Sequence, residues 1–188
     1  FLILNQISKN KLSKRIIFNS KSTIEECVRE GKQILFLTAH LGSFETVLAY
    51  GSSLGWKTCV LVKKIKDTVI DDIITDQREK FGAKVVKVED KYPVNELLKV
   101  INSGYHGIIV FDQYENHGIS SSFFGVETKT SRLLAYLVHL KDFIVIPVFS
   151  HRSKKGEIVI EANSPIQYKK SGSKKEDLHF NTQLFNDC

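Results

Sequence analysis

The stretch QILFLTAHLGSFE at residues 33–45 changes from strand character to helix character within a few positions. Its first part, residues 33–38, is apolar in the centre without polar alternation, which is typical of strands buried inside a parallel sheet. Gly42 and Ser43 interrupt this pattern, and a helix is predicted from Ser43 as its N-cap to Tyr50. A buried strand that leads directly into a helix is the repeating unit of layered α/β proteins, so this stretch predicts that fold class.

The rest of the chain repeats the alternation of strand and helix patterns. Further strands are expected at 58–62, 84–88, 107–111, 143–150 and 157–161, and helices at 23–29, 67–81, 93–104 and 130–140. A basic turn separates the last two strands, so they are expected to pair as an antiparallel hairpin at one edge of a mostly parallel sheet flanked by helices. The residues at 112–122 are expected to form a polar loop, with a helix starting near Leu178 in the polar tail. We expect one domain over 1–188, with 1–22 and 169–188 as peripheral segments.

Composition narrows the possible classes of protein. The chain has 188 residues, of which 42% are hydrophobic and 26% charged, the balance of a folded domain. Its apolar runs are strand-sized and too short to span a membrane. Lys and Arg exceed Asp and Glu by 27 − 21 = 6, and the excess gathers in clusters at 9–15, 63–66 and 169–175. A basic surface attracts nucleic acid, anionic lipid headgroups or an acidic carrier protein.

Cysteine and histidine spacing argues against a disulfide framework or a metal centre. The three cysteines form an odd set without CxxC spacing, and the six histidines are scattered along the chain. Cys59 lies inside an apolar strand and is interpreted as a core residue. No metal or other cofactor is therefore expected.

His40 follows the strand at 33–38 by two residues. Ligands of open α/β sheets bind outside the carboxyl ends of the strands, which makes this position a candidate site. The start of the next helix is expected to leave the backbone N–H groups of Gly42 and Ser43 free for an anion or a developing oxyanion. Glu45, in the first helical turn, is expected to hold the imidazole of His40 and stabilise its charged form. His40 and Glu45 thus form a candidate acid–base pair that would activate a hydroxyl group or a water molecule.

Two further segments carry candidate site residues. Asp112 and Gln113 follow the apolar strand at 107–111, and an aromatic–glycine turn stands at 123–125. Together with the His40 element, this arrangement resembles the late acyltransferases of lipid A biosynthesis, the membrane-associated lauroyl and myristoyl transferase family. The blocks of that family, H-x-G-N-W-E, R-x-x-x-G, D-Q and F-F-G, stand here in the same order at 40–45, 78–82, 112–113 and 123–125.

The resemblance extends over roughly residues 23–168 and includes the strand that contains Ile146-Pro147-Val148. Ser43 and Phe44 replace the Asn and Trp of the family pattern, which keeps a small polar residue and an aromatic ring. The family pattern also has an N-terminal membrane helix and a basic, aromatic C-terminal segment. We therefore expect this chain to be an incomplete acyltransferase domain that lacks both.

The resemblance implies a glycerolipid-acyltransferase-like fold and a direct acyl transfer. The acyl chain would pass from acyl carrier protein, or from acyl-CoA, to a hydroxyl of a lipid A precursor that His40 deprotonates while Glu45 holds the imidazole. Arg78 would pair with a phosphate or with Glu45, and Asp112 would orient Arg78 or the acceptor sugar. The other residues implied in substrate binding are Gly42, Ser43, Gln113 and Phe124, the last lining an acyl groove with Phe123 and Tyr114.

The partners implied by the resemblance are the acyl donor, an anionic lipid acceptor and a membrane surface, at the cytoplasmic face of the bacterial inner membrane. The residues leave three alternatives open: an acyltransferase for another lipid, such as a glycerophosphate or a glycolipid, a non-catalytic basic binding module, and an inactive remnant. Binding of nucleic acid is not expected, because the chain has neither a glycine-rich phosphate loop nor an aromatic motif that stacks bases.

Overall fold

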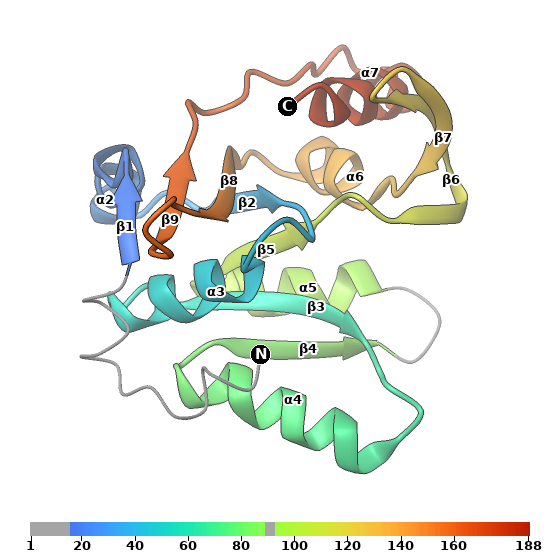
Figure 1. Ribbon diagram of the computed structural model, residues 1–188. Coiled ribbons are helices and arrows are strands. Elements are labelled where there is room, and N and C mark those ends of the chain that lie inside the picture. The colour runs from blue at the N-terminus through green and yellow to red at the C-terminus, as the bar shows by residue number, and fades with distance from the viewer. Residues whose placement is uncertain (1–15, 89–92) are drawn as a thin grey trace.

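The computed structural model describes residues 16–88 and 93–188 and has a seven-stranded sheet at its centre (Figure 1). The strand order is β1-β9-β8-β2-β5-β3-β4. These strands are β1 Ile16–Asn19, β2 Ile34–Thr38, β3 Thr58–Lys63, β4 Lys84–Val88, β5 His106–Val110, β8 Ile144–Arg152 and β9 Ile158–Ala162. The five strands β8, β2, β5, β3 and β4 pair in parallel, and β9 runs antiparallel to β8. The mostly parallel sheet expected from the sequence is confirmed.

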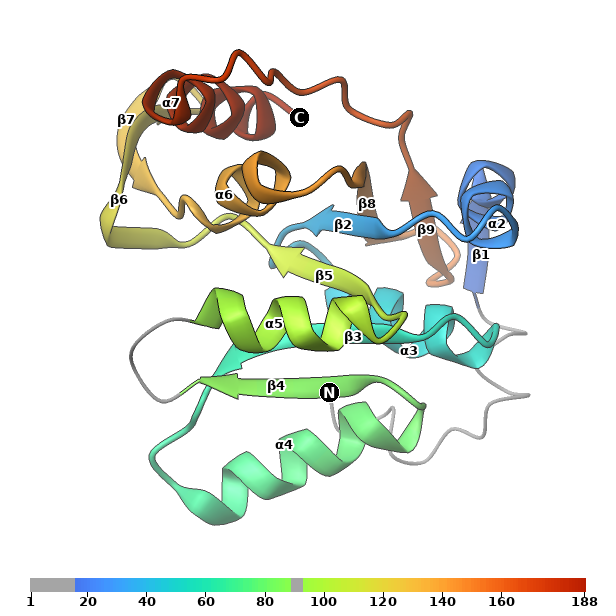
Figure 2. The same cartoon turned by 180° about the vertical axis from the view of Figure 1, so that it is seen from behind.

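Helices cover both faces of this sheet. They are α2 Lys21–Arg29, α3 Phe44–Ser53, α4 Thr68–Lys80, α5 Pro93–Asn102, α6 Leu133–Leu140 and α7 Lys174–Asn186. Figures 1 and 2, seen from opposite sides, show α3 in front of the sheet in one view and α5 in front in the other. Among the residues described, none of these helices combines the length and the apolar character needed to span a bilayer.

Alternating side chains of β2 supply the two hydrophobic cores. Ile34 and Phe36 pack into a core that includes residues of α2 and α3. Leu35 and Leu37 point to the opposite face and pack into a core shared with α5, α6 and α7. Because successive side chains of a strand point to opposite faces, a strand that is apolar at every position requires helices on both sides. The unbroken apolar run of β2 is thus explained by the layers around it.

Several elements differ in detail from the sequence expectation. β1 pairs in parallel with β9, so the β8–β9 hairpin lies one strand inside the edge of the sheet. Most of the expected loop at 112–122 is instead strand β6 Tyr114–Phe123, which pairs with β7 Val126–Thr130 in a second antiparallel hairpin. The alternation in β6 is incomplete, with a register shift between Tyr114 and Ile119, and this irregularity hides the strand from a pattern search.

Helix ends follow the local capping chemistry in part. Asp67 caps α4 by accepting hydrogen bonds from the backbone N–H groups of Val69 and Ile70, as its position before the helix suggested. α2 begins at Lys21 after Ser20, two residues before the start expected at Thr23.

The last helix, α7, extends from Lys174 rather than from Leu178. It buries Leu178 and Phe185 in the core shared with α5 and α6. The N-terminal part of the described chain is also integrated into the fold, since β1 forms the edge strand beside β9.

Replacing Leu137 of α6 by alanine should lower the free energy of unfolding by about 2–5 kcal/mol, because its side chain is fully buried in the core shared with α5 and α7. Leu140, one turn further along α6, is 47% exposed and provides the matched control. Leu140→Ala should cost much less when both variants are unfolded in urea. Equal losses for the two variants would contradict the described packing of α6.

Candidate functional site

The site is built at the carboxyl edge of the sheet, where β2 and β5 end side by side. Their parallel register places Thr38 beside Val110, and the backbone N–H of Phe111 still donates to the carbonyl of Thr38 at 3.0 Å. His40 and Asp112 each follow the last paired residue of their strand by two positions. The register therefore brings together two residues that are 72 positions apart in the chain.

Asp112 binds His40 through both of its carboxylate oxygens. Oδ2 accepts a hydrogen bond from the backbone N–H of His40 at 2.9 Å, and Oδ1 lies 2.8 Å from the ring atom Nδ1. An ionised carboxylate only accepts hydrogen bonds, so Nδ1 must carry the proton. In a neutral imidazole this leaves Nε2 unprotonated and able to accept a proton. The side chain of His40 is 40% exposed, so the ring is accessible to a substrate.

The ring of His40 is also held from the side of helix α3. Phe44, the first residue of that helix, contacts the imidazole edge-to-face with ring centroids 4.9 Å apart. The imidazole is thus fixed by a carboxylate from one strand end and by an aromatic ring from the helix that follows it. Sequence reasoning noted Phe44 only as a substitution in a family block and did not give it this contact.

Glu45 has a different partner from the one expected. It was expected to hold the imidazole, but its carboxylate forms a bidentate pair with Arg78, with Nε to Oε2 at 3.1 Å and Nη2 to Oε1 at 2.5 Å. Glu45 lies in the first turn of α3, whereas Arg78 lies in the last turn of α4. Both side chains are largely buried, 11% and 16% exposed, which strengthens the pairing relative to a surface ion pair. Arg78 as a partner of Glu45 was one of the two roles proposed for it from the sequence.

The loop between His40 and α3 is pressed against the end of β8. Gly42 has φ +60°, and a Cβ atom at this position would lie only 2.2 Å from the carbonyl oxygen of Ser150. The backbone N–H of Ser43 was expected to be free for an oxyanion, but it donates to Oγ of Ser150 at 3.1 Å. Ser150 is 1% exposed, so this hydroxyl is a built-in partner of the loop. The sequence signal for Ser150 is its place at the end of the strand expected at 143–150.

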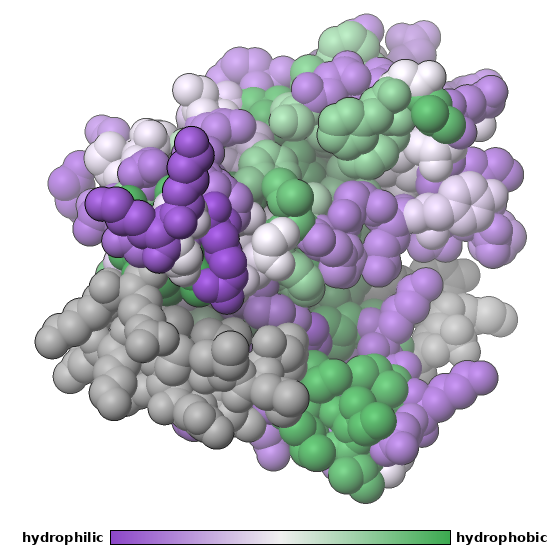
Figure 3. Space-filling view, in the orientation of Figure 1, coloured by the Kyte–Doolittle hydropathy of each residue, from purple (hydrophilic) through white to green (hydrophobic). Residues whose placement is uncertain are grey.

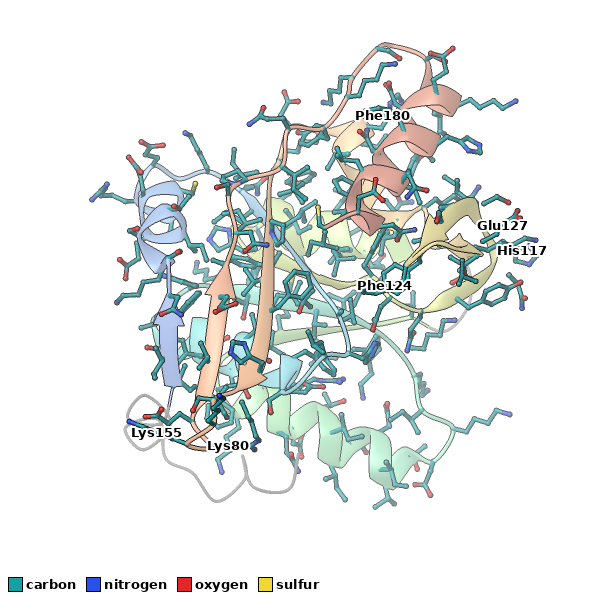
Figure 4. The ribbon with its side chains drawn as sticks, turned by 45° about the horizontal axis from the view of Figure 1, so that its top comes forward. Lys80, His117, Phe124, Glu127, Lys155 and Phe180 are labelled. Carbon is teal, nitrogen blue, oxygen red and sulfur yellow. The ribbon has the colours of Figure 1, made fainter. Side chains whose placement is uncertain are left out.

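Two other predicted site residues lie beside or beyond this group. Gln113 follows Asp112 directly and is exposed. Phe124 lies in the turn between β6 and β7, where its side chain is 92% exposed and its ring contacts Phe123 at 4.7 Å. In Figure 4 it lies on the inner side of the hairpin, whereas His117 and Glu127 lie on the outer side.

The hairpin that carries Phe124 is attached to helix α7. The side-chain amide of Gln183 bonds both the N–H and the carbonyl of Ser122, at 2.7 and 3.0 Å. Asn186 donates to the hydroxyls of Ser121 and Thr130, both at 2.9 Å. Phe124 itself has φ +51°, a left-handed conformation that is unfavourable for a bulky side chain. Backbone strain often occurs at functional sites, so Phe124 stays a candidate for contact with a ligand.

Neither a metal cluster nor the thiol of Cys59 offers a second reactive centre in the part of the chain that the structure describes. Within 16–88 and 93–188, no three His, Cys, Asp or Glu side chains gather as a metal site. Burial raises the pKa of the Cys59 thiol to about 12, which keeps it protonated and unreactive. The buried position of Cys59 in β3 thus agrees with its interpretation as a core residue.

The fold and the site define an α/β protein with a hydrogen-bonded histidine–aspartate pair at the carboxyl edge of its sheet. The chain belongs to the bacterial lipid A biosynthesis acyltransferase family, whose model matches residues 1–187. It is also 25% identical over 161 residues to lipid A biosynthesis acyltransferase 2 of Shigella flexneri, a match that covers 83% of this chain and 50% of the relative. The chain thus spans about half the length of this curated relative.

Replacing Gly42 by alanine should destabilise the protein more than replacing Gly31 by alanine. Both glycines have positive φ, +60° and +70°, so both substitutions carry a backbone cost of about 1–2 kcal/mol. Only at Gly42 would the new Cβ meet the backbone of Ser150, which should add about 1–3 kcal/mol. Urea unfolding of the two variants measures the difference, and equal losses would show that the loop does not press against β8.

Proposed function

We propose that this chain is the catalytic part of an enzyme that transfers a fatty acyl chain from a thioester donor to a hydroxyl of a lipid A precursor. The observation that carries the proposal is the His40–Asp112 pair, at 2.8 Å, in a chain that belongs to the lipid A acyltransferase family. The relative from Shigella flexneri is named as a lipid A biosynthesis acyltransferase. The donor would be acyl carrier protein or acyl-CoA, both of which present the acyl group as a thioester.

His40 acts as the general base. Its Nε2 takes the proton of the acceptor hydroxyl while the oxygen attacks the thioester carbonyl carbon. The carbon–sulfur bond then breaks, and the leaving thiolate takes the proton from the imidazolium, so His40 returns to its starting state. Asp112 stabilises the imidazolium that forms between these steps, as the third member of a hydrolase triad does. The acyl group passes directly to the acceptor, and no acyl-enzyme is needed.

Glu45 and Arg78 belong to the catalytic machinery of this proposal, but Glu45 acts on His40 through the helix rather than through a hydrogen bond to the ring. Their ion pair ties the first turn of α3 to the end of α4, and that turn carries Phe44 against the imidazole. A loss of the pair would let the turn move, and small displacements of a general base cost rate steeply.

Substrate contacts are assigned to residues around this centre. Gln113 and Phe124 are both exposed. In this proposal Gln113 donates to the acceptor sugar and Phe124 contacts the acyl chain. Gly42 allows close approach of the loop, and Ser43 supports it through Ser150. An anionic lipid acceptor and an acidic carrier protein both fit the formal net charge of +6. We place the enzyme at the cytoplasmic face of the inner membrane, where such substrates meet.

His40→Ala should abolish acyl transfer, and Asp112→Asn should lower kcat by about 10²–10⁴-fold, because an amide cannot hold the imidazole in the same tautomer as a carboxylate. Acyl transfer to a tetra-acylated lipid A precursor, from acyl carrier protein and from acyl-CoA, is measured in membranes that contain the full-length protein. His117→Ala, on the outer side of the hairpin, is the control and should keep wild-type activity. Wild-type activity in His40→Ala would refute the mechanism. A wild-type protein that is inactive on this precursor but acylates another lipid would change the proposed acceptor.

Glu45→Ala and Arg78→Ala should each reduce kcat by about 10–100-fold, and the double variant should be no worse than the more impaired single variant. Two residues that act as one unit show such non-additive losses in a double-mutant cycle. The measurement is the same acyl transfer, with protein amounts normalised. Losses that multiply in the double variant would show that the two residues act independently.

A further inference from the structure

The last turn of helix α7 contacts the chain on both sides of Asp112. On the side before it, Phe111 packs edge-to-face against Phe185, with ring centroids 6.0 Å apart. Both rings are buried, 5% and 2% exposed. On the side after it, the chain enters strand β6 at Tyr114, and the side chain of Asn186 binds the β6–β7 hairpin. Two consecutive residues of one helix thus hold the chain before and after the carboxylate that binds His40.

Thr130 closes the base of this hairpin. The register shift in β6 gives it two partners there, Tyr114 and Ile119. Tyr114 comes two residues after Asp112, so the position of Thr130 sets the direction in which the chain leaves the reactive centre. The base is also closely packed, since a Cβ atom at Gly118 would clash with the carbonyl oxygen of Thr130. Thr130 therefore has little room to move without a movement of Tyr114.

A small group of polar side chains, Asn186, Ser121 and Thr130, fixes the hairpin base to α7. Nδ2 of Asn186 donates to Oγ1 of Thr130 and to Oγ of Ser121, both at 2.9 Å. The two hydroxyl groups bond each other at 2.8 Å. Thr130 is 4% exposed and Ser121 is 9% exposed, so these hydrogen bonds are shielded from water. Shielding strengthens hydrogen bonds, and the group therefore restrains the hairpin base firmly.

Attachment of α7 to the rest of the fold does not require this polar group. Leu178 and Phe185 already lie in the core shared with α5 and α6. Asn181 fixes the middle of the helix to the N–H and the carbonyl of Lys169, both at 2.8 Å. Polar side chains are costly to bury, whereas apolar packing holds elements together without that cost. Hydrogen bonds add a fixed direction, which is what a defined position of the hairpin base needs.

The arrangement of the hairpin agrees with this role of α7. Figures 1 and 2 both show α7 beside the β6–β7 hairpin, on the side that faces the rest of the molecule. Figure 3 shows mostly hydrophilic side chains along the outer edge of the hairpin. The hairpin is thus held from its inner side, and its orientation depends on the contacts with α7.

We propose that Asn186 and Thr130 are positioning residues for Asp112. They fix the base of the hairpin and thereby hold the carboxylate against both the backbone and the ring of His40, at 2.9 and 2.8 Å. The inference rests on the proposed function, in which Asp112 stabilises the imidazolium. A shifted carboxylate would lose one of its two hydrogen bonds, and a displacement of about 1 Å at a reactive centre can cost about 10²-fold in rate.

Two substitutions of Thr130 separate positioning from packing. Thr130→Val nearly keeps the shape and removes the hydroxyl, whereas Thr130→Ser keeps the hydroxyl and removes a methyl group. In ¹⁵N NMR of the full-length protein, Thr130→Val should lower the fraction of neutral His40 rings that carry their proton on Nδ1, and Thr130→Ser should keep the wild-type fraction. Asn186→Leu, which keeps a similar volume without the amide, should match Thr130→Val. A wild-type fraction in Thr130→Val or in Asn186→Leu, or an equal loss in Thr130→Ser, would overturn the proposal.

Gln183→Leu is the matched control on the same helix. The amide of Gln183 binds the N–H and the carbonyl of Ser122, at 2.7 and 3.0 Å, close to the turn of the hairpin rather than to its base. Its removal should therefore leave the proton of His40 on Nδ1. A loss as large as that in Asn186→Leu would show that any loosening of α7 has the same effect, and the positioning role would be refuted.

Kinetics of acyl transfer give a second readout. Asn186→Leu and Thr130→Val should lower kcat by about tenfold and leave the KM of the acyl donor unchanged, because they displace a group that acts in the transition state. A raised KM with an unchanged kcat would contradict the proposal. The NMR measurement needs no acyl transfer, so a failure of the proposed reaction can be told apart from a failure of this inference.

Discussion

The parallel register between β2 and β5 is the constraint on which the site depends. It sets Thr38 beside Val110. His40 and Asp112 each follow two residues after these, so the register of the strands brings them together. A shift of one residue would turn the apolar side chains of one strand to the wrong face of the sheet, so the two cores hold the register. Packing on both faces therefore determines the geometry of a hydrogen bond at the edge.

Support for this hydrogen bond comes from elements on either side of it. The end of β8 holds the loop through Ser150, and the ion pair between Glu45 and Arg78 holds the first turn of α3. Such contacts leave the imidazole few alternative positions. A site built on strand ends and helix starts is more rigid than one built on a long loop, and a general base needs that rigidity.

Much of this architecture follows from local sequence patterns, and the remainder depends on contacts between distant segments. The apolar runs at 33–38 and 107–111 predicted two buried strands, and the polar residues after them pointed to the correct edge of the sheet. Which carboxylate would reach His40 was not predictable, because both Glu45 and Asp112 are near it and only the strand order decides between them. Glu45 was the expected partner from its proximity in sequence, but helix α4 supplies Arg78 to it instead.

Other features gave weaker signals. Ser150 stands at the end of an expected strand, but its contact with Ser43 depends on β8 being the neighbour of β2. The β6–β7 hairpin has a clear turn at Phe124-Gly125, yet the irregular β6 lacks the alternation that marks a strand. Local patterns thus predicted most of the helices and strands of the sheet, whereas the neighbours of each element depend on contacts between distant segments.

The central claim is that Asp112 holds His40 as the tautomer that keeps Nε2 free to accept a proton. The most direct test is ¹⁵N NMR of the histidine side chains, with the signals of His40 assigned by their absence in His40→Gln. We expect the neutral ring to carry its proton on Nδ1, and we expect Asp112→Asn to disturb this preference. A neutral ring protonated on Nε2, or a spectrum unchanged by Asp112→Asn, would contradict the account.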